Sequence, residues 1–371
     1  MTYSREQLRE IFYIGLMILV VGLIVFSRLQ QKDDHSFTPP ENYSSDPNAS
    51  ESFPEIIGTG PDAIGAGPEK KLSVFTNPEQ LGQAITDNPI PYIGIIILGV
   101  MVMGLLVISI PALVIYLIVR FKGRDPLITE PRRPVKWTLG DVLKSVAVFI
   151  LLSFFIRAII TAVLTLAPPS RKLIAVHRLD FHLGSQIITE FLLILFCIYL
   201  VVEVRGGSLA QLGLTSSHFF KNIFRGFSGY VIAAPVLVVM LIFSNLLVER
   251  FGEPPDIKII MEFLSPQYGF RHVLSGFLMI AVIAPVAEEI FFRGFLQGAL
   301  RRRLSFWPAI IISALFFALL HFRFAAGPFL FTFGLLLGYL YEKTQSLIPV
   351  ITVHLVHNSI ISFYTIFVLL L

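Results

Sequence analysis

The stretch "VLSGFLMIAVIAPVAEEIFFRGFL", residues 273–296, decides the fold. It is long enough to cross a bilayer, which takes about 20 apolar residues in a helix. It nevertheless carries Glu288, Glu289 and Arg293. A charged side chain at the bilayer centre costs about 2.5–3.5 kcal/mol on insertion scales, and such residues mark functional sites. The stretch therefore predicts a membrane-spanning helix that holds a polar functional site.

Composition places the whole chain in a membrane. Of its 371 residues, 55% are hydrophobic and only 15% are charged, whereas soluble domains carry about 25% charged residues. Basic residues beside membrane spans account for the net charge of +4. We therefore expect the lipid bilayer as a partner and no nucleic acid. Cys197 is the only cysteine, so the chain forms no internal disulfide and no cysteine-based metal cluster.

Nine apolar runs are candidates for membrane spans. None alternates polar and apolar residues as the strands of a membrane barrel do. The sequence therefore predicts an all-α protein, a polytopic transmembrane helix bundle of about eight to nine spans. The runs cover residues 11–26, 92–119, 142–167, 185–203, 224–248, 273–293, 308–322, 325–341 and 347–370.

The chain divides into four parts. Residues 1–27 form an N-terminal membrane anchor, and residues 28–90 form a linker rich in Pro, Gly and Ser. The linker lacks helical or strand periodicity, which is typical of a disordered or weakly ordered segment. Residues 91–205 supply accessory transmembrane helices. Residues 206–371 form the transmembrane core, and its polar motifs fall within 270–365.

Basic residues predict the orientation. The loop "RFKGRDPLITEPRRPVK", residues 120–136, and the run "RRR", residues 301–303, fall on one side if the spans alternate. Cytoplasmic loops carry an excess of Lys and Arg, so this side is expected in the cytoplasm. The N-terminus is then cytoplasmic and the linker external. A multi-pass protein of the plasma membrane, such as a bacterial inner membrane, is the simplest assignment.

Two later helices bring polar groups to the level of the glutamates. At 1.5 Å per residue, Glu288 and His321 lie about 20 and 22 Å from the basic side. His354 and Asn358, on the last span, lie about 10 to 17 Å from it. We expect these groups from three helices to meet inside the membrane.

Helical spacing predicts how these groups face. Glu289 and Arg293 are four residues apart and can form an ion pair. Glu288 points about 100° away, which leaves its carboxylate to act as a general base. His354 and Asn358 also share a face and could stabilise an oxyanion. The set suits activation of water for attack on an amide.

Three motifs in this order resemble a known family. "EEIFFR" (residues 288–293), "FALLH" (317–321) and "HLVHN" (354–358) have the forms E-E-x-x-x-R, F-x-x-x-H and H-x-x-x-N. They resemble the CPBP family of intramembrane proteases, which includes type II CaaX prenyl endopeptidases and bacteriocin-processing and self-immunity proteins. The segment "LAQLGLTSSHFFKNIFRG" (209–226) is similar to the one that often precedes this core. The resemblance implies an endopeptidase that cleaves a membrane-embedded peptide or protein.

The resemblance also implies roles for single residues. Glu288 would activate the water, assisted by His321. Glu289 and Arg293 would hold the site together and orient the substrate.

The remaining implied roles concern the oxyanion and a metal. His354 and Asn358 would stabilise the oxyanion, and Phe317 would pack the site. The family has often been described as metalloproteases, and zinc could be held by Glu288, His321 and His354. The helical zinc motif H-E-x-x-H is absent from the sequence. We therefore expect no cofactor and a glutamate-dependent reaction, with zinc as the alternative.

Other classes of protein remain open. "GFSG", residues 226–229, has the form of a rhomboid serine protease motif, although Ser228 falls near the cytoplasmic start of its helix, where small residues suit packing. A transporter could use the same intramembrane charges, but the chain shows no inverted repeat. A non-catalytic immunity or scaffold protein of the same fold is the other alternative.

Overall fold

The computed structural model describes residues 78–371 except 126, 128, 167–169 and 252–256. The predicted anchor and most of the predicted linker lie outside these residues. Within the described residues all regular structure is helical and no strand occurs. The expected all-α class is therefore confirmed.

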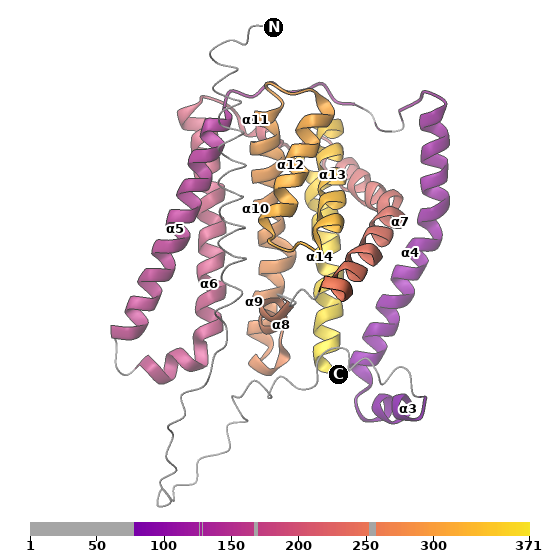
Figure 1. Cartoon of the computed structure of the whole chain (residues 1–371), viewed down its shortest axis with the longest axis vertical. Coiled ribbons are helices and arrows are strands. Elements are labelled where there is room, and N and C mark those ends of the chain that lie inside the picture. Colours follow the sequence, from indigo (N-terminus) through magenta and orange to yellow (C-terminus); the bar gives the residue numbers. More distant parts are fainter. Residues whose placement is uncertain (1–77, 126, 128, 167–169, 252–256) are drawn as a thin grey trace, which may run out of the picture.

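Eight helical segments correspond to the eight apolar runs after residue 90 (Figure 1). Six of them are long and apolar enough to cross a membrane, and the chain is therefore a multi-pass membrane protein. The first predicted span, residues 11–26, lies outside the described residues. The segments are α4 (Pro89–Phe121), α5 (Leu139–Leu166), α6 (Ser170–Tyr199) with η4 (Leu200–Val204), α7 (Phe219–Phe251), the composite helix from Phe270 to Leu300, α12 (Phe306–Leu320), α13 (Gly327–Thr344) and α14 (Leu347–Leu370).

Helices α12 and α13 depart from the expected full-length spans. With 15 residues, α12 is about 22 Å long and falls short of the roughly 30 Å of hydrocarbon. It ends because Phe322 takes a left-handed conformation, with φ of 53°. Pro328 then starts α13. Figure 1 shows their connection well short of the lower end that α14 reaches, so His321, the C-cap residue of α12, lies partway along the bundle.

Two predicted boundaries change. The end of the predicted linker is helical, as α3 (Pro78–Asp87), because Leu81 and Ile85 lie four residues apart on one partly buried face. Helix α6 begins at Ser170, well before the predicted start at residue 185.

The composite helix is irregular where it carries the glutamates. It consists of α9 (Phe270–Leu278), η7 (Met279–Ile283), α10 (Ala284–Glu289), η8 (Ile290–Gln297) and α11 (Gly298–Leu300). Segments η7 and η8 are π-helical, and π-bulges are frequent at functional sites. Pro285 lacks a backbone N–H and cannot continue the α-helical hydrogen bonding, which explains the distortion before it.

Close backbone contacts pack the helices around this segment. Helix α7 lies against α4, α13 and α14. A Cβ at Gly226 of α7 would come within 2.4 Å of the Pro349 carbonyl oxygen, so only glycine allows this approach to α14. The "GFSG" stretch is therefore explained by helix packing. Short helices α8 (Ile257–Phe263) and η6 (Pro266–Tyr268) precede the composite helix.

The loops predicted to lie on one side do lie together. Glu130 N–H donates to the Lys343 carbonyl at 2.9 Å, and Arg302 donates to the Trp137 carbonyl at 3.0 Å. Leu347 N–H donates to the Gly213 carbonyl at 2.9 Å. The loops after α4, η4, α11 and α13 therefore meet at one end of the bundle, at the top of Figure 1.

Candidate active site

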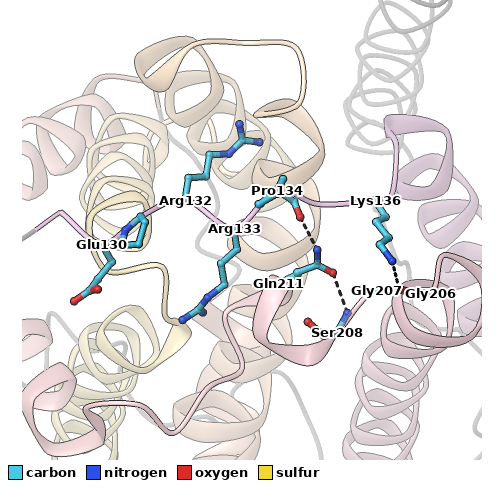
Figure 2. A pocket seen from close by; sticks show the side chains of 10 residues that line it. Glu130, Arg132, Arg133, Pro134, Lys136, Gly206, Gly207, Ser208 and Gln211 are labelled. Carbon is cyan, nitrogen blue, oxygen red and sulfur yellow. Dashed lines mark hydrogen bonds between the residues drawn. The ribbon is translucent and has the colours of Figure 1, made fainter.

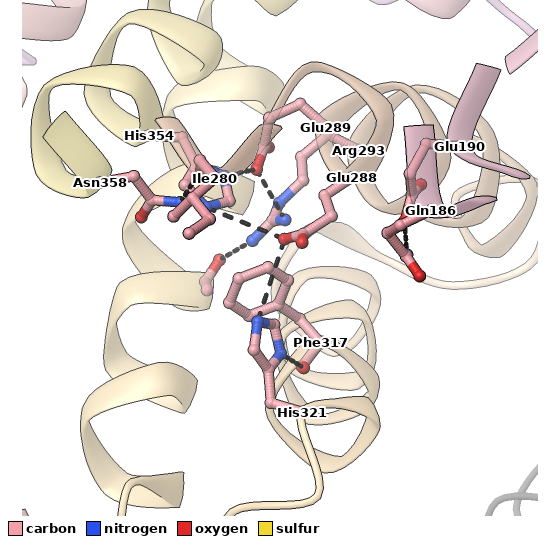
Figure 3. Close-up of polar contacts among 11 residues, drawn as sticks. Gln186, Glu190, Ile280, Glu288, Glu289, Arg293, Phe317, His321, His354 and Asn358 are labelled. Atoms are coloured by element: carbon pink, nitrogen blue, oxygen red, sulfur yellow. Dashed lines mark hydrogen bonds and ion pairs between the residues drawn. The ribbon is translucent and has the colours of Figure 1, made fainter. Parts of the chain in front are cut away.

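Three helical elements position the predicted site residues (Figure 3). Glu288 and Glu289 end α10, and Arg293 follows in η8. His321 caps the C-terminus of the short helix α12. His354 and Asn358 lie on α14, which packs against α10 and η7. The structure thus brings the carboxylates and imidazoles of separate motifs together.

Glu289, Arg293 and His354 form a buried cluster. Arg293 Nη1 donates to Glu289 Oε1 at 3.1 Å, and both side chains are fully buried. His354 Nδ1 donates to the same Oε1 at 2.7 Å. The Arg293 guanidinium also lies over the Phe317 ring, 4.5 Å from its centroid. The predicted ion pair is confirmed, and it fixes His354 as well.

Glu288 lies on the accessible side of this cluster. Its Oε2 lies 4.0 Å from His321 Nε2 and 3.8 Å from His354 Nε2. The side chains of Glu288 and His321 are 26% and 30% exposed, in contrast to the buried Glu289. Oε2 of Glu288 receives no hydrogen bond from the described part of the chain. The carboxylate is thus left for a group other than the protein.

Hydrogen bonds at Nδ1 orient both imidazoles. His321 Nδ1 lies 2.6 Å from the Phe317 carbonyl, which can only accept, so Nδ1 carries the proton. In the neutral ring Nε2 is then an acceptor that faces Glu288. His354 has the same arrangement because its Nδ1 is bound to Glu289. Two lone pairs and a carboxylate facing one another suit a small donor such as water.

Asn358 has a structural contact that the sequence does not reveal. Its Nδ2 donates to the Ile280 carbonyl at 2.9 Å. In the π-helical η7, the Ala284 N–H bonds to Met279, and the next residue is Pro285, which has no N–H to offer Ile280. Asn358 therefore satisfies a carbonyl that the proline leaves free. An amide nitrogen has two N–H donors, so one remains for a substrate.

Sequence reasoning missed a carboxyl group beside this site. Glu190 of α6 is 9% exposed and accepts a hydrogen bond from Gln186 Nε2 at 2.9 Å. Its charge and that of Glu288 repel each other. An acidic residue within the predicted span 185–203 is the signal that could have identified it.

His357 lies between His354 and Asn358 in the sequence but is not one of the defined residues of the H-x-x-x-N pattern. Its ring stacks on Phe329, with centroids 5.1 Å apart, and packs against Phe333 at 4.8 Å. Tyr230 Oη lies 3.1 Å from its Nδ1. These contacts tie α14 to α7 and α13 on the side of the helix next to His354.

The three groups named as possible zinc ligands lie near one another, with Glu288 Oε2 4.0 Å from His321 Nε2 and 3.8 Å from His354 Nε2. Zinc–nitrogen and zinc–oxygen bonds are about 2.0–2.2 Å long, in a tetrahedral set. Among the residues that the structure describes, no three His, Cys, Asp or Glu side chains are grouped in this way. Carboxylate and imidazole are donor types that suit zinc. Zinc binding by these three residues is therefore to be tested by experiment.

The fold and the site define a class: a multi-pass helical membrane protein with acid, imidazole and guanidinium groups clustered inside its bundle. Residues 270–360 match the family model described as Rce1-like, type II CAAX prenyl endopeptidase. This match over residues 270–360 confirms the resemblance to the CPBP family and supports a protease of the CAAX type. Neither the curated proteins nor the solved structures give a match to the chain.

Proposed function

We propose that the chain is an intramembrane endopeptidase that hydrolyses a peptide bond of a membrane-embedded peptide or protein. One observation carries the proposal: Glu288 Oε2, itself buried, lies within 4.0 Å of two imidazole Nε2 atoms and has no hydrogen bond from the described residues. Of these groups, Glu288 and His321 are suited to hold and polarise a water molecule. The Rce1-like domain supports the same reaction class.

The proposed reaction begins with proton transfer. Glu288 takes a proton from the water as its oxygen attacks the carbonyl carbon of the substrate, while His321 holds the water. The carbonyl π electrons move to oxygen and form an oxyanion. When the C–N bond breaks, Glu288 returns the proton to the leaving nitrogen. One water is consumed, and a carboxyl and an amine are released.

The oxyanion needs donors on the opposite side of the substrate carbonyl. The remaining N–H of Asn358 is one. His354, which Glu289 holds through Nδ1, is the other, and this role requires a proton on its Nε2. Glu289 and Arg293 act as positioning residues, since their contacts fix His354.

The experiment compares membrane and secreted peptides from cells that make wild-type protein, Glu288→Gln or Glu203→Gln. Loss of a general base lowers rates by about 10²–10⁴-fold, so the substrate accumulates uncleaved with Glu288→Gln. Glu203 is an exposed carboxylate of η4 and serves as the matched control. Identical peptide profiles in all three strains, with the variants normally inserted, would refute the proposal.

Zinc is the competing account, and bound to Glu288, His321 and His354 it would supply a Lewis acid for the water. We expect purified active protein to contain zinc far below one ion per chain, and cleavage to survive chelation. Stoichiometric zinc, lost together with activity, would favour the metal alternative.

A further inference from the structure

A basic pocket lies at the end of the bundle where the four loops meet. It has a volume of about 540 Å³. One wall is the extended segment from Glu130 to Lys136, before α5, and the other is the turn from Gly206 to Gln211, before α7 (Figure 2). Gln211 joins the walls, since its Nε2 donates to the Pro134 carbonyl and its Oε1 accepts from Ser208 N–H. The pocket is thus held open by the fold.

Three cations line this pocket, and none has a carboxylate partner among the residues that the structure describes. Arg133 Nη1 donates to the carbonyls of Ala210 and Gln345, at 3.0 and 2.9 Å. Lys136 donates to the Gly206 carbonyl. Four other basic residues at this end are paired with acids. The pairs are Arg205 with Asp141, Arg225 with Glu130, Arg301 with Glu342, and Lys343 with Asp125.

Arg132 is the least satisfied of the three. Within the described residues its guanidinium has neither a hydrogen bond nor an ion pair. Partial burial, and then the neighbouring Arg301, lower the pKa of Arg132. Glu130 is the one acid of the lining, and it lies 3.7 Å from Arg225. Three cations minus one carboxylate give the lining a formal charge of +2.

We propose that this pocket binds the phosphate of an anionic lipid headgroup. Phosphate oxygens accept several charge-assisted hydrogen bonds, which unpaired guanidinium and ammonium groups provide. A bound phosphate would also relieve the repulsion between Arg132 and Arg301. The site is separate from the Glu288 cluster and does not depend on the proposed peptidase activity.

Surrounding apolar side chains favour a lipid over free phosphate. Val204 and Leu209 flank the Gly206–Ser208 turn and are 50% and 43% exposed. The pocket lies between the C-terminal end of η4 and the start of α5, where membrane-crossing helices end. Basic pockets between helices on the cytoplasmic side are a common form of anionic headgroup site. Acyl chains would lie against Val204 and Leu209 while the phosphate enters the pocket.

The test uses full-length protein purified in detergent and three probes: phosphatidylglycerol, phosphatidylcholine and inorganic phosphate. Native mass spectrometry counts retained lipids, and thermal unfolding with each probe measures stabilisation. We expect phosphatidylglycerol to be retained and to raise Tm more than the other two. Each basic residue at a membrane surface contributes about fivefold in affinity, so Arg132→Gln with Lys136→Gln should weaken binding about thirtyfold.

The matched control is Lys122→Gln with Arg124→Gln, which removes the same charges from exposed positions in the same loop, outside the pocket. It should bind phosphatidylglycerol like wild type. Equal retention of the two lipids by wild type, or equal weakening by both double variants, would overturn the proposal. If inorganic phosphate raises Tm as much as phosphatidylglycerol does, the claim that the bound phosphate belongs to a lipid would be overturned. If Arg132→Gln with Lys136→Gln fails to fold, the single variant Arg132→Gln and the comparison of the two lipids on wild-type protein test the proposal instead.

Discussion

Glu288 and Glu289 are neighbours in the chain with different surroundings. Glu289 is fully buried and its Oε1 is bonded to Arg293 and His354, whereas the Glu288 side chain is partly exposed and forms no such bond within the described residues. The first arrangement stabilises the fold, and the second leaves a carboxylate available for chemistry. Two adjacent acids on one helix can thus have different roles, one structural and one chemical.

This difference predicts that Glu289→Gln and Glu288→Gln affect stability unequally. Removing one partner of a buried ion pair costs about 3–5 kcal/mol because the other charge remains buried. Glu288→Gln removes no protein hydrogen bond at Oε2, so we expect a change below about 1 kcal/mol. Unfolding of the purified variants in mixed detergent micelles measures both.

The double variant Glu289→Gln with Arg293→Met tests whether the cost of Glu289→Gln comes from leaving the buried Arg293 charge unpaired. It removes both members of the pair and should recover part of the lost stability. Equal costs for Glu288→Gln and Glu289→Gln would contradict this account of the two glutamates.

Irregular helix geometry is the main feature at the level of elements. Pro285 and η7 leave the Ile280 carbonyl without a helical donor, and Asn358 of α14 supplies one. The contact ties the helix that bears Glu288 to the helix that bears His354. A proline that would weaken an isolated helix therefore fixes the distance between two motifs.

This account predicts coupling between Asn358 and Pro285. Asn358→Ala leaves a buried carbonyl unpaired and should cost about 1–3 kcal/mol. With Pro285→Ala present, the new N–H can bond to Ile280, so the same change should cost at least about 0.5 kcal/mol less. A double-mutant cycle of unfolding free energies measures the coupling.

Ser362 provides the control on the same helix. Its hydroxyl is buried without a hydrogen-bond partner among the described residues, so Ser362→Ala should be neutral or stabilising. Additive effects of Asn358→Ala and Pro285→Ala would show that the proline does not create the need for the amide.

Helix contact also assigns a role to the "GFSG" stretch. We expect Gly226→Ala to destabilise by about 1–3 kcal/mol, since its Cβ would overlap the Pro349 carbonyl. Gly99→Ala in α4 has no atom within 4 Å of its Cβ and should stabilise by about 0.5–1 kcal/mol. Unfolding in micelles compares them, and a neutral Gly226→Ala would contradict the packing account.

The short α12–α13 hairpin shapes the molecule as a whole. The hairpin packs against α7, α14 and the composite helix, and its connection ends well short of the lower end of α14 (Figure 1). His321 is therefore placed at the depth of Glu288 by the length of α12. The basic loops gather at the opposite end of α12, where they tie the bundle together.

Orientation can be tested with single cysteines. In a Cys197→Ala background, we expect Arg124→Cys, in the basic loop after α4, to resist a membrane-impermeant thiol reagent added to intact cells. Tyr268→Cys lies before α9, at the other end of the composite helix, and should be labelled. Both should react after permeabilisation. The reverse pattern in intact cells would invert the proposed orientation.

The sequence by itself determined the helical class, the eight helical segments that correspond to apolar runs, and the motif residues that meet in the bundle. Apolar length and charge spacing are local properties, and the Glu289–Arg293 pair lies one helical turn apart, so both could be predicted. Tertiary structure alone decided that Asn358 bonds to Ile280, that Glu190 lies beside Glu288, and that Arg132 lies in a pocket without a hydrogen bond or ion pair from the described residues. Each depends on how separate helices and loops pack, which periodicity along one helix does not encode.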